Sequence, residues 1–181
     1  YGAFANGGFR VEPATILRVE DSEGHTLYRH EPQSARRVLD ARVAYLITDI
    51  LSDEFARMSA FGEGSPLRLT RPAAVKTGTS SDWRDNWTIG YTPQLVTGVW
   101  VGNADNEPMY HVSGITGAAP IWHDFMEEVL RGKPVIGFDE PPGLVRQEIC
   151  ADSGLLPSVT ASEVTLPAGA ATSISCPRTI T

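Results

Sequence analysis

Residues Ala73-Ala74-Val75-Lys76-Thr77-Gly78-Thr79 predict an extended strand, because small and β-branched residues predominate among them. Residues 80–85 are polar and typical of a turn. Two more β-rich runs follow, residues 86–91 and 95–102, and they are joined at Thr92-Pro93-Gln94. We therefore expect an antiparallel meander of three strands.

Two segments on either side of this meander carry apolar residues at helical spacing. The first follows Asp40, a favourable N-cap, and its apolar residues are Val43, Leu46, Ile47, Ile50 and Leu51. The second begins at Pro120 and ends before Gly132, with Ile121, Trp122, Phe125, Met126, Val129 and Leu130 on one face. Each helix is expected to pack that face on a core. The predicted fold class is α+β, an antiparallel sheet packed against amphipathic helices.

The first forty residues are expected to hold less regular structure. Segments 14–20 and 25–30 are β-rich and flank Asp21-Ser22-Glu23-Gly24, which predicts a β-hairpin. Asn6-Gly7-Gly8 is typical of a helix end, yet only five residues precede it. Since so short a helix is not stable alone, we expect the chain to begin inside a domain; a simple N-terminal loop is the alternative.

The C-terminal part of the sequence has a different composition. Residues 134–143 are rich in proline and are interpreted as a linker after a first domain, residues 1–133. Residues 144–181 are rich in Ser, Thr, Ala and Val, which predicts a small β-rich appendage. The two cysteines, Cys150 and Cys176, both lie in it and are predicted to form a disulfide worth roughly 3 to 4 kcal/mol by loop closure. Two reduced, buried thiols are the alternative.

Composition excludes several classes of protein. The 181 residues suffice for one domain, and the net charge of -7 with scattered basic residues excludes a nucleic-acid binder. The sequence has no apolar run of 18 residues and no signal-peptide pattern at its N-terminus. The four histidines lack metal-ligand spacing, and the acidic loop 103–107 lacks that of a calcium loop, so we expect no metal and no cofactor. The four tryptophans are interpreted as packing residues rather than sugar platforms.

Lys76-Thr77-Gly78-Thr79 is the candidate site within the predicted strand. On an edge strand, a lysine ammonium and two threonine hydroxyls would present positive charge and hydrogen-bond donors to one groove. Gly78 lacks a side chain, so another backbone can approach there. These features suit an extended peptide that ends in a carboxylate, because the strand edge supplies a backbone ladder while Lys and Thr bind the anion.

The sequence around this motif is similar to that of a known family. Residues 75–93, which include Lys-Thr-Gly-Thr and run to Gly90-Tyr91-Thr92-Pro93, resemble the transpeptidase domain of bifunctional class A penicillin-binding proteins of the 1C-like type. The resemblance extends to residues 1–8, 99–103 and 117–122, and so covers roughly residues 1–130. It implies a C-terminal part of a penicilloyl-serine transferase fold.

The resemblance also implies a function. Such enzymes cross-link peptidoglycan stem peptides through an acyl-serine and are acylated by β-lactams. By the match, Lys76 would sustain positive potential and the proton relay, Thr77 and Thr79 would bind the substrate carboxylate, and the Thr79 backbone N–H would form half of the oxyanion hole. Gly78 would let the acyl chain lie against the strand. The parent protein would be anchored in the cytoplasmic membrane, with its transpeptidase domain outside and a glycosyltransferase region upstream.

The sequence departs from the family's pattern in one important respect. Such sites also use a Ser-x-x-Lys nucleophile and a Ser-x-Asn triplet. The only lysines, Lys76 and Lys133, are preceded three positions earlier by Ala73 and Leu130, and none of the four asparagines completes Ser-x-Asn. The chain is therefore expected to be an inactive piece of the enzyme.

Two other functions stay open on the sequence. A noncatalytic extracytoplasmic module could capture a peptide on the same edge strand. A serine β-lactamase shares the strand motif, but the linker and tail after Gly132 argue against it.

Overall fold

The computed structural model describes residues 1–32, 34–150, 154–159 and 174–175. The chain divides into two compact units, Tyr1–Pro142 and Gly143–Thr181. The predicted linker, residues 134–143, thus falls almost entirely in the first unit. There the ring of Phe138 packs edge-on against Tyr91 with ring centroids 5.8 Å apart.

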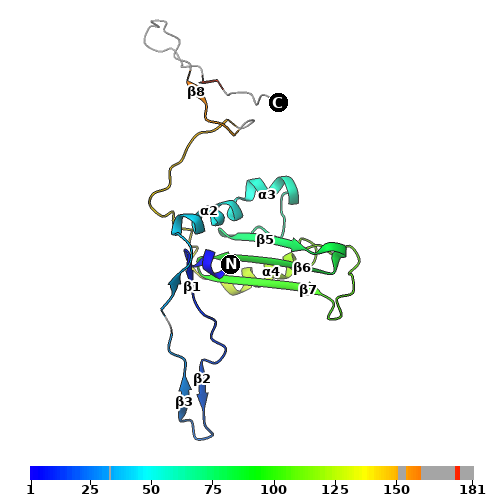
Figure 1. Ribbon diagram of the computed structural model, residues 1–181. Coiled ribbons are helices and arrows are strands. Elements are labelled where there is room, and N and C mark those ends of the chain that lie inside the picture. Colours follow the sequence, from blue (N-terminus) through cyan, green and yellow to red (C-terminus); the bar gives the residue numbers. More distant parts are fainter. Residues whose placement is uncertain (33, 151–153, 160–173, 176–181) are drawn as a thin grey trace. The chain divides into compact units, whose positions relative to one another are not determined.

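The first unit is built on an antiparallel sheet of three strands, as the sequence predicts (Figure 1). The strands are β5 (Ala74–Thr79), β6 (Asp85–Thr92) and β7 (Leu95–Gly102), in the spatial order β5-β6-β7. Strand β5 pairs only with β6 among the described residues, so one edge of β5 is free.

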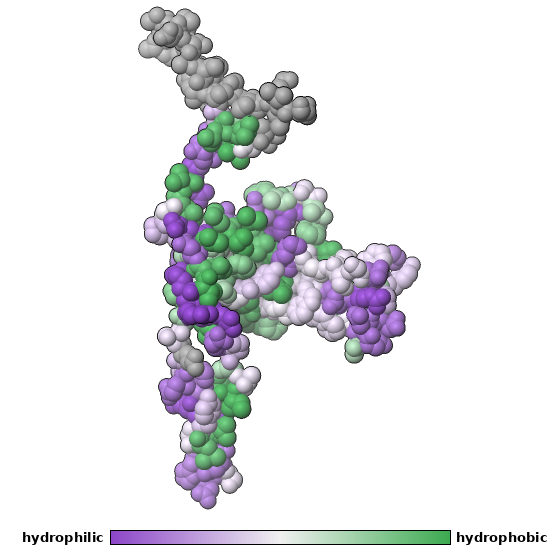
Figure 2. Space-filling view, viewed as in Figure 1, coloured by the Kyte–Doolittle hydropathy of each residue, from purple (hydrophilic) through white to green (hydrophobic). Residues whose placement is uncertain are grey.

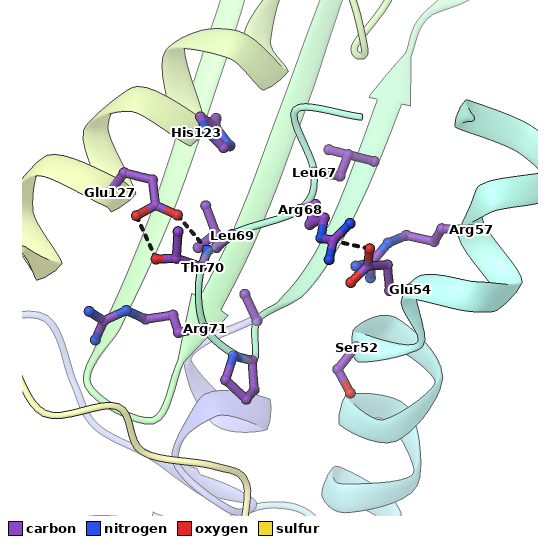
Figure 3. Close-up of a pocket in the computed structure, with 12 residues that line it drawn as sticks. Ser52, Glu54, Arg57, Leu67, Arg68, Leu69, Thr70, Arg71, His123 and Glu127 are labelled. Carbon is purple, nitrogen blue, oxygen red and sulfur yellow. Dashed lines mark hydrogen bonds and ion pairs between the residues drawn. The ribbon is translucent and has the colours of Figure 1, made fainter. Parts of the chain in front are cut away.

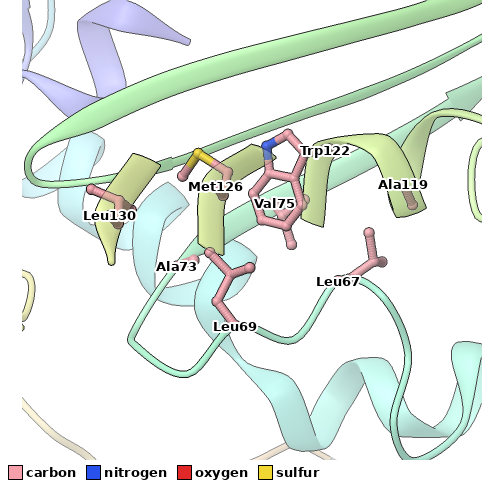
Figure 4. Packing of buried hydrophobic residues seen from close by; sticks show 8 residues of the cluster. All are labelled: Leu67, Leu69, Ala73, Val75, Ala119, Trp122, Met126 and Leu130. Atoms are coloured by element: carbon pink, nitrogen blue, oxygen red, sulfur yellow. The ribbon is translucent and has the colours of Figure 1, made fainter. Parts of the chain in front are cut away.

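Helix α4 (Ala118–Leu130) packs on one face of this sheet and forms the core with it (Figure 4). The core consists of Leu67, Leu69, Ala73, Val75, Ala119, Trp122, Met126 and Leu130. The indole of Trp122 lies directly over Gly90, where a Cβ atom would stand 2.3 Å from the ring. Only part of the predicted apolar face is buried, because Ile121, Phe125 and Val129 are exposed on the side away from the sheet.

Helix α2 (Ala41–Ser52) begins where predicted, with the Asp40 side chain accepting a hydrogen bond from the Arg42 amide. The predicted packing face is right only in part: Val43, Leu46 and Ile50 are exposed, and Ile47 and Leu51 are half-buried. The fully buried residues of the helix are Ala44 and Thr48. The reason is a polar anchor: the Thr48 hydroxyl lies 2.9 Å from the phenol oxygen of Tyr91 on β6. This bond turns the narrow Ala44 and Thr48 side toward the sheet. Figure 2 shows apolar surface over the region of α1 and α2.

The N-terminal elements are short. Helix α1 (Gly2–Ala5) is followed by β1 (Phe9–Arg10), which pairs with β4 (Arg36–Arg37). Strands β2 (Arg18–Glu20) and β3 (Thr26–Arg29) form the predicted hairpin, with shorter strands than expected. Helix α3 (Glu54–Phe61), capped by Asp53 and ended by Gly62, was not predicted from the sequence. The 3-10 turn η1 (Ser81–Trp83) lies within the turn predicted for residues 80–85.

The second unit contains one strand pair among its described residues, β8 (Ser158–Val159) with β9 (Ile174–Ser175). Cys150 is buried and disulfide-bonded. Cys176 lies outside the described residues, so its pairing with Cys150 stays a prediction.

Candidate active site

The Lys-Thr-Gly-Thr motif forms the C-terminal part of β5, along the free edge of the sheet. Lys76 and Gly78 are exposed, and no heavy atom lies within 4 Å of the position that a Cβ at Gly78 would take. The Lys76 ammonium donates a hydrogen bond of 2.6 Å to the Thr77 carbonyl oxygen. The edge is therefore open to another chain at Gly78.

Lys76 and the two threonines do not share one face of the sheet. Successive residues of a strand point to opposite faces, so Lys76 and Gly78 lie on one face while Thr77 and Thr79 lie on the other. The register places Trp87 and Trp100 on the Lys76 face, directly across from Gly78. Because β5 is an outer strand, both sets of side chains still border the free edge.

A loop between β7 and α4 covers the threonine face, and it was missed by sequence reasoning. The amide of Gly114 donates a hydrogen bond of 2.9 Å to the Thr79 hydroxyl oxygen, and the Thr88 hydroxyl donates one of 3.2 Å to the Gly114 carbonyl. A Cβ at Gly114 would come within 3.0 Å of Thr77 and Gly78 atoms, so only glycine fits. This contact leaves the Thr79 hydroxyl proton free to donate elsewhere, because its oxygen is already used as an acceptor.

Asn86 fixes the far end of the same loop. Its side chain is fully buried. The amide nitrogen donates a hydrogen bond of 3.3 Å to the Val112 carbonyl, and the amide oxygen accepts one of 3.0 Å from the Ala118 amide. The second bond caps the N-terminus of α4, which has no side-chain cap of its own. The glycines at 114 and 117 beside an inward-facing asparagine were the available signal in the sequence.

The turn after Thr79 is stabilised by Ser80 and Asp85. The Ser80 amide donates a hydrogen bond of 3.0 Å to the Asp85 carbonyl, and the Asp85 amide donates one of 2.9 Å to the Ser80 hydroxyl. The Trp100 indole donates a hydrogen bond of 3.0 Å to the Asp85 carboxylate. Hydrogen bonding from Ser80 first, and then from Trp100, lowers the pKa of Asp85 below its ordinary value.

The sequence of this chain matches the model of a known protein family. The model described as the penicillin binding protein transpeptidase domain matches residues 1–127, which include every residue of the candidate site. The chain belongs to the penicillin-binding protein transpeptidase family.

Individual relatives of this transpeptidase domain agree with that assignment. Penicillin-binding protein 2D of Bacillus subtilis is 37% identical over 159 residues, which cover 85% of this chain and 23% of the relative. Penicillin-binding protein 1A of Neisseria lactamica is 34% identical, over 86% of this chain and 21% of the relative. The chain therefore spans about a fifth of the length of these curated relatives.

Solved structures show the same fold. The crystal structure of penicillin-binding protein 1A from Haemophilus influenzae superposes with a TM-score of 0.71 at 25% identity, over 86% of this chain and 29% of that one. The penicillin-binding protein PonA1 from Mycobacterium tuberculosis gives a TM-score of 0.62 at 25% identity, over 82% and 43%. The chain thus has part of the penicilloyl-serine transferase fold that its sequence resemblance implied.

The four tryptophans differ in their burial. Trp122 is fully buried, as predicted, whereas Trp83, Trp87 and Trp100 are 42–45% exposed. The sheet face and the turn that carry these three have no cover in the described residues, so a packing role for them stays a prediction.

A cavity of about 810 Å³ lies apart from the Lys-Thr-Gly-Thr strand, between α3, α4 and the segment that precedes β5 (Figure 3). Its acidic groups are already partnered. Glu127 accepts hydrogen bonds from the Thr70 amide and hydroxyl, and Glu54 pairs with Arg68 at 2.9 Å. The carboxylates therefore hold the cavity wall together.

Within the part of the chain that the structure describes, no three His, Cys, Asp or Glu side chains are arranged to hold a metal ion. Of the helices in the same residues, none combines the length and the apolar character that a membrane crossing requires.

Proposed function

We propose that this chain is the C-terminal part of the transpeptidase domain of a peptidoglycan D,D-transpeptidase, and that it supplies the substrate-binding strand of the active site. The observation that carries the proposal is the free edge of β5 with an open position at Gly78, in a chain that belongs to this family. An extended peptide can add to such an edge by backbone hydrogen bonds.

The roles proposed for the motif follow from its geometry. The Thr79 hydroxyl accepts from Gly114 and keeps its proton to donate to the substrate carboxylate, with Thr77 on the same face of the strand. The Thr79 backbone N–H would bind the oxygen on which negative charge develops during acyl transfer. Lys76, exposed at the same edge, would supply positive potential and the proton relay beside the nucleophile.

The nucleophilic serine would come from polypeptide that this chain does not include, since the sequence has no Ser-x-x-Lys. The uncovered face that bears Lys76, Trp87 and Trp100, and the exposed apolar side of α2, fit a surface that this polypeptide covers. The whole enzyme would bind β-lactams, act outside the cytoplasmic membrane from a membrane anchor, and carry a glycosyltransferase region upstream. The Cys150 disulfide is compatible with an oxidising compartment.

Labelling with a fluorescent penicillin tests the proposal. The complete protein that contains this chain should be acylated at a serine outside these 181 residues, and the isolated chain should stay unlabelled. A covalent adduct on a serine of the isolated chain would show that the assignment of the nucleophile is wrong. A complete protein that resists labelling would favour the noncatalytic peptide-binding module.

A further inference from the structure

A cavity of about 230 Å³ lies between α1, α2, the turn from β6 to β7 and the segment after α4. Three aromatic residues from separate elements line it: Phe4 on α1, Tyr45 on α2 and Phe138 in the segment after α4. All three are half-buried, and we call this space the aromatic cavity. Its volume is below the roughly 300 to 1,000 Å³ of pockets for drug-sized ligands, so it suits a small chemical group.

The aromatic cavity lies away from the C-terminal end of the Lys-Thr-Gly-Thr strand. Thr79 pairs with Asn86 near the start of β6, whereas Pro93, which lines the cavity, follows the end of β6. Seven residues at about 3.3 Å each separate Asn86 from Pro93, so the two lie roughly 20 Å apart. Figure 1 shows α1 and the first turn of α2 at the end of the sheet where β6 turns into β7.

The rings are held in place by contacts with the rest of the fold. Phe138 packs edge-on against Tyr91, with ring centroids 5.8 Å apart. The Tyr91 phenol in turn hydrogen-bonds Thr48, which lies one helical turn beyond Tyr45 on α2. Helix α1, which carries Phe4, packs against α2. The walls of the aromatic cavity are thus preorganised, which reduces the free-energy cost of binding a ligand.

The electrostatics of the aromatic cavity favour a cation. Of the residues that line it, Asp139 is the only charged one, and it is exposed. The N-terminus of α2 also reaches the cavity, at Ala41, but the carboxylate of Asp40 caps that end and offsets its partial positive charge. Aromatic rings carry partial negative charge on their faces, so the three rings and the carboxylate together attract a positive group.

The cavity offers few acceptors to a primary ammonium group. Such a group has three N–H donors and is strongly hydrated, so it needs several acceptors in place of water. The Thr48 hydroxyl is already engaged by the Ala44 carbonyl and the Tyr91 phenol. Tyr45 and Asp139 are the remaining lining residues whose side chains can accept. A quaternary ammonium has no N–H donor to satisfy and presents methyl groups to the rings.

We propose that the aromatic cavity is a binding site for a quaternary ammonium group. The methyl groups lie against the rings of Phe4, Tyr45 and Phe138, and the positive charge faces the Asp139 carboxylate. The site is separate from the peptide-binding strand, so the inference does not rest on the proposed function. It gives this domain a second ligand, of a chemical class different from an acyl peptide.

Choline and its neutral isostere 3,3-dimethylbutan-1-ol, which has carbon in place of the charged nitrogen, test the site on the 181-residue chain. The methyl proton signal of choline should shift upfield on binding, because the methyl groups lie against aromatic rings. Titration of this shift should give a Kd of about 1 mM, since each ring contributes modestly. The alcohol, and ethanolamine with its primary ammonium, should each bind about tenfold more weakly.

Variants separate the contribution of the rings from that of the charge. Tyr45→Phe keeps the ring and should change the choline affinity less than about twofold, whereas Tyr45→Leu should lower it about tenfold. Asp139→Asn, at an exposed position where folding is not at risk, should lower it about threefold and leave the alcohol unaffected. Asp124→Asn, which removes another exposed carboxylate, on α4, should change neither affinity.

Three results would overturn the inference. Equal affinity for choline and the alcohol would show an apolar cavity without any preference for charge. Ethanolamine that binds as tightly as choline would contradict the quaternary class of the ligand. A complete protein that contains this chain and does not bind choline would show that other polypeptide fills the cavity.

A quaternary ammonium can belong to a soluble molecule or to a lipid head group. Phosphocholine in solution and vesicles of phosphatidylcholine distinguish the two sources. Sedimentation of the chain with vesicles, abolished by Tyr45→Leu, would support the site with a lipid as its ligand. Binding of phosphocholine as tight as that of choline, without sedimentation on vesicles, would support the site with a soluble ligand.

Discussion

The amide of Gly114 donates a hydrogen bond to the hydroxyl oxygen of Thr79 across 35 positions of sequence. This contact orients the hydroxyl, because an oxygen that already accepts a bond from the loop has its proton left to donate toward the free edge of β5. The loop between β7 and α4 is thus part of the binding strand's support. Asn86 on β6 holds the other end of this loop at Val112 and caps α4 at Ala118, which couples the site to the core.

Replacement of Thr79 tests this orientation. Thr79→Val should weaken binding of Nα,Nε-diacetyl-Lys-D-Ala-D-Ala to the chain about tenfold, since a hydrogen bond to a carboxylate is lost, whereas Thr79→Ser should change it less than about twofold. Calorimetric or fluorescence titration measures both. The control is Thr88→Val, which frees the Gly114 carbonyl without touching the edge. If this control weakens binding as much as Thr79→Val, then Thr79 acts only through the loop.

The sequence was sufficient to predict the sheet but not the faces of the helices. Strand alternation and the turn residues predicted β5, β6 and β7, because a strand's pattern is set by its own residues. The face that a helix buries depends on its partner, and the Thr48 bond to Tyr91 is a contact between residues 43 positions apart. The apolar periodicity of α2 therefore indicated a helix correctly and its packing side only in part.

The sequence predicted the motif of the site but not the residues that hold this motif in place. Lys76 to Thr79 stand together in the sequence, so their place on one edge strand followed from a single prediction. Gly114 and Asn86 come from other segments, and their contacts with Thr79 and Ala118 depend on the register of β5 with β6. The rings of Trp83 and His111 likewise come from two loops that only the folded sheet brings together.

The contact between Trp122 and Gly90 predicts a large difference between two glycines of the sheet. Gly90→Ala would place a methyl group 2.3 Å from the indole, so we expect a loss of about 1 to 3 kcal/mol in the free energy of unfolding. Gly98→Ala, with its nearest neighbour at 3.5 Å, should change stability by less than about 0.5 kcal/mol. Urea unfolding of both variants decides the matter, and equal losses would contradict the placement of Trp122.

Tyr91 is predicted to make the free energy of unfolding fall with rising pH in the alkaline range. The Thr48 hydroxyl donates to the Ala44 carbonyl, so the phenol of Tyr91 must donate to Thr48. Burial raises the pKa of Tyr91 above its ordinary value of 10.0, against a lowering by Thr48. A raised pKa gives stability that is present below about pH 10 and lost as pH rises through the folded value.

The substitution Tyr91→Phe should cost about 1 kcal/mol at pH 7 and flatten this alkaline loss, because it removes both the hydrogen bond and the titrating group. Unfolding curves at pH 7 and at about pH 10.5 measure both effects. Tyr28→Phe, on the exposed hairpin, is the control and should change neither. An unchanged alkaline slope in Tyr91→Phe would mean that another group titrates.

Glu127 should contribute stability in the opposite pH range. Burial raises the pKa of Glu127. Hydrogen bonds from the Thr70 amide and hydroxyl, together with the nearby His123 and Arg71, lower it by more, so the net pKa lies below 4.5. The contribution is therefore present above pH 4.5 and lost as pH falls through the folded value. Glu127→Gln should cost about 1 kcal/mol at pH 7 and less at about pH 3. Glu128→Gln, which breaks only an exposed pair with Arg131, should cost under about 0.5 kcal/mol.

A substitution at Gly78 should change peptide binding without changing the stability of the fold. No atom lies within 4 Å of a Cβ at this position, and its φ is not in the left-handed region, so Gly78→Ala should leave the free energy of unfolding within about 0.5 kcal/mol of wild type. A peptide that lies against the strand must approach this same position, and the added methyl group would obstruct it. We therefore expect the affinity for Nα,Nε-diacetyl-Lys-D-Ala-D-Ala to fall about tenfold, as measured by titration of the folded variant. Unchanged affinity in a fully folded Gly78→Ala chain would mean that no ligand backbone passes along β5, and the strand would lose its proposed role.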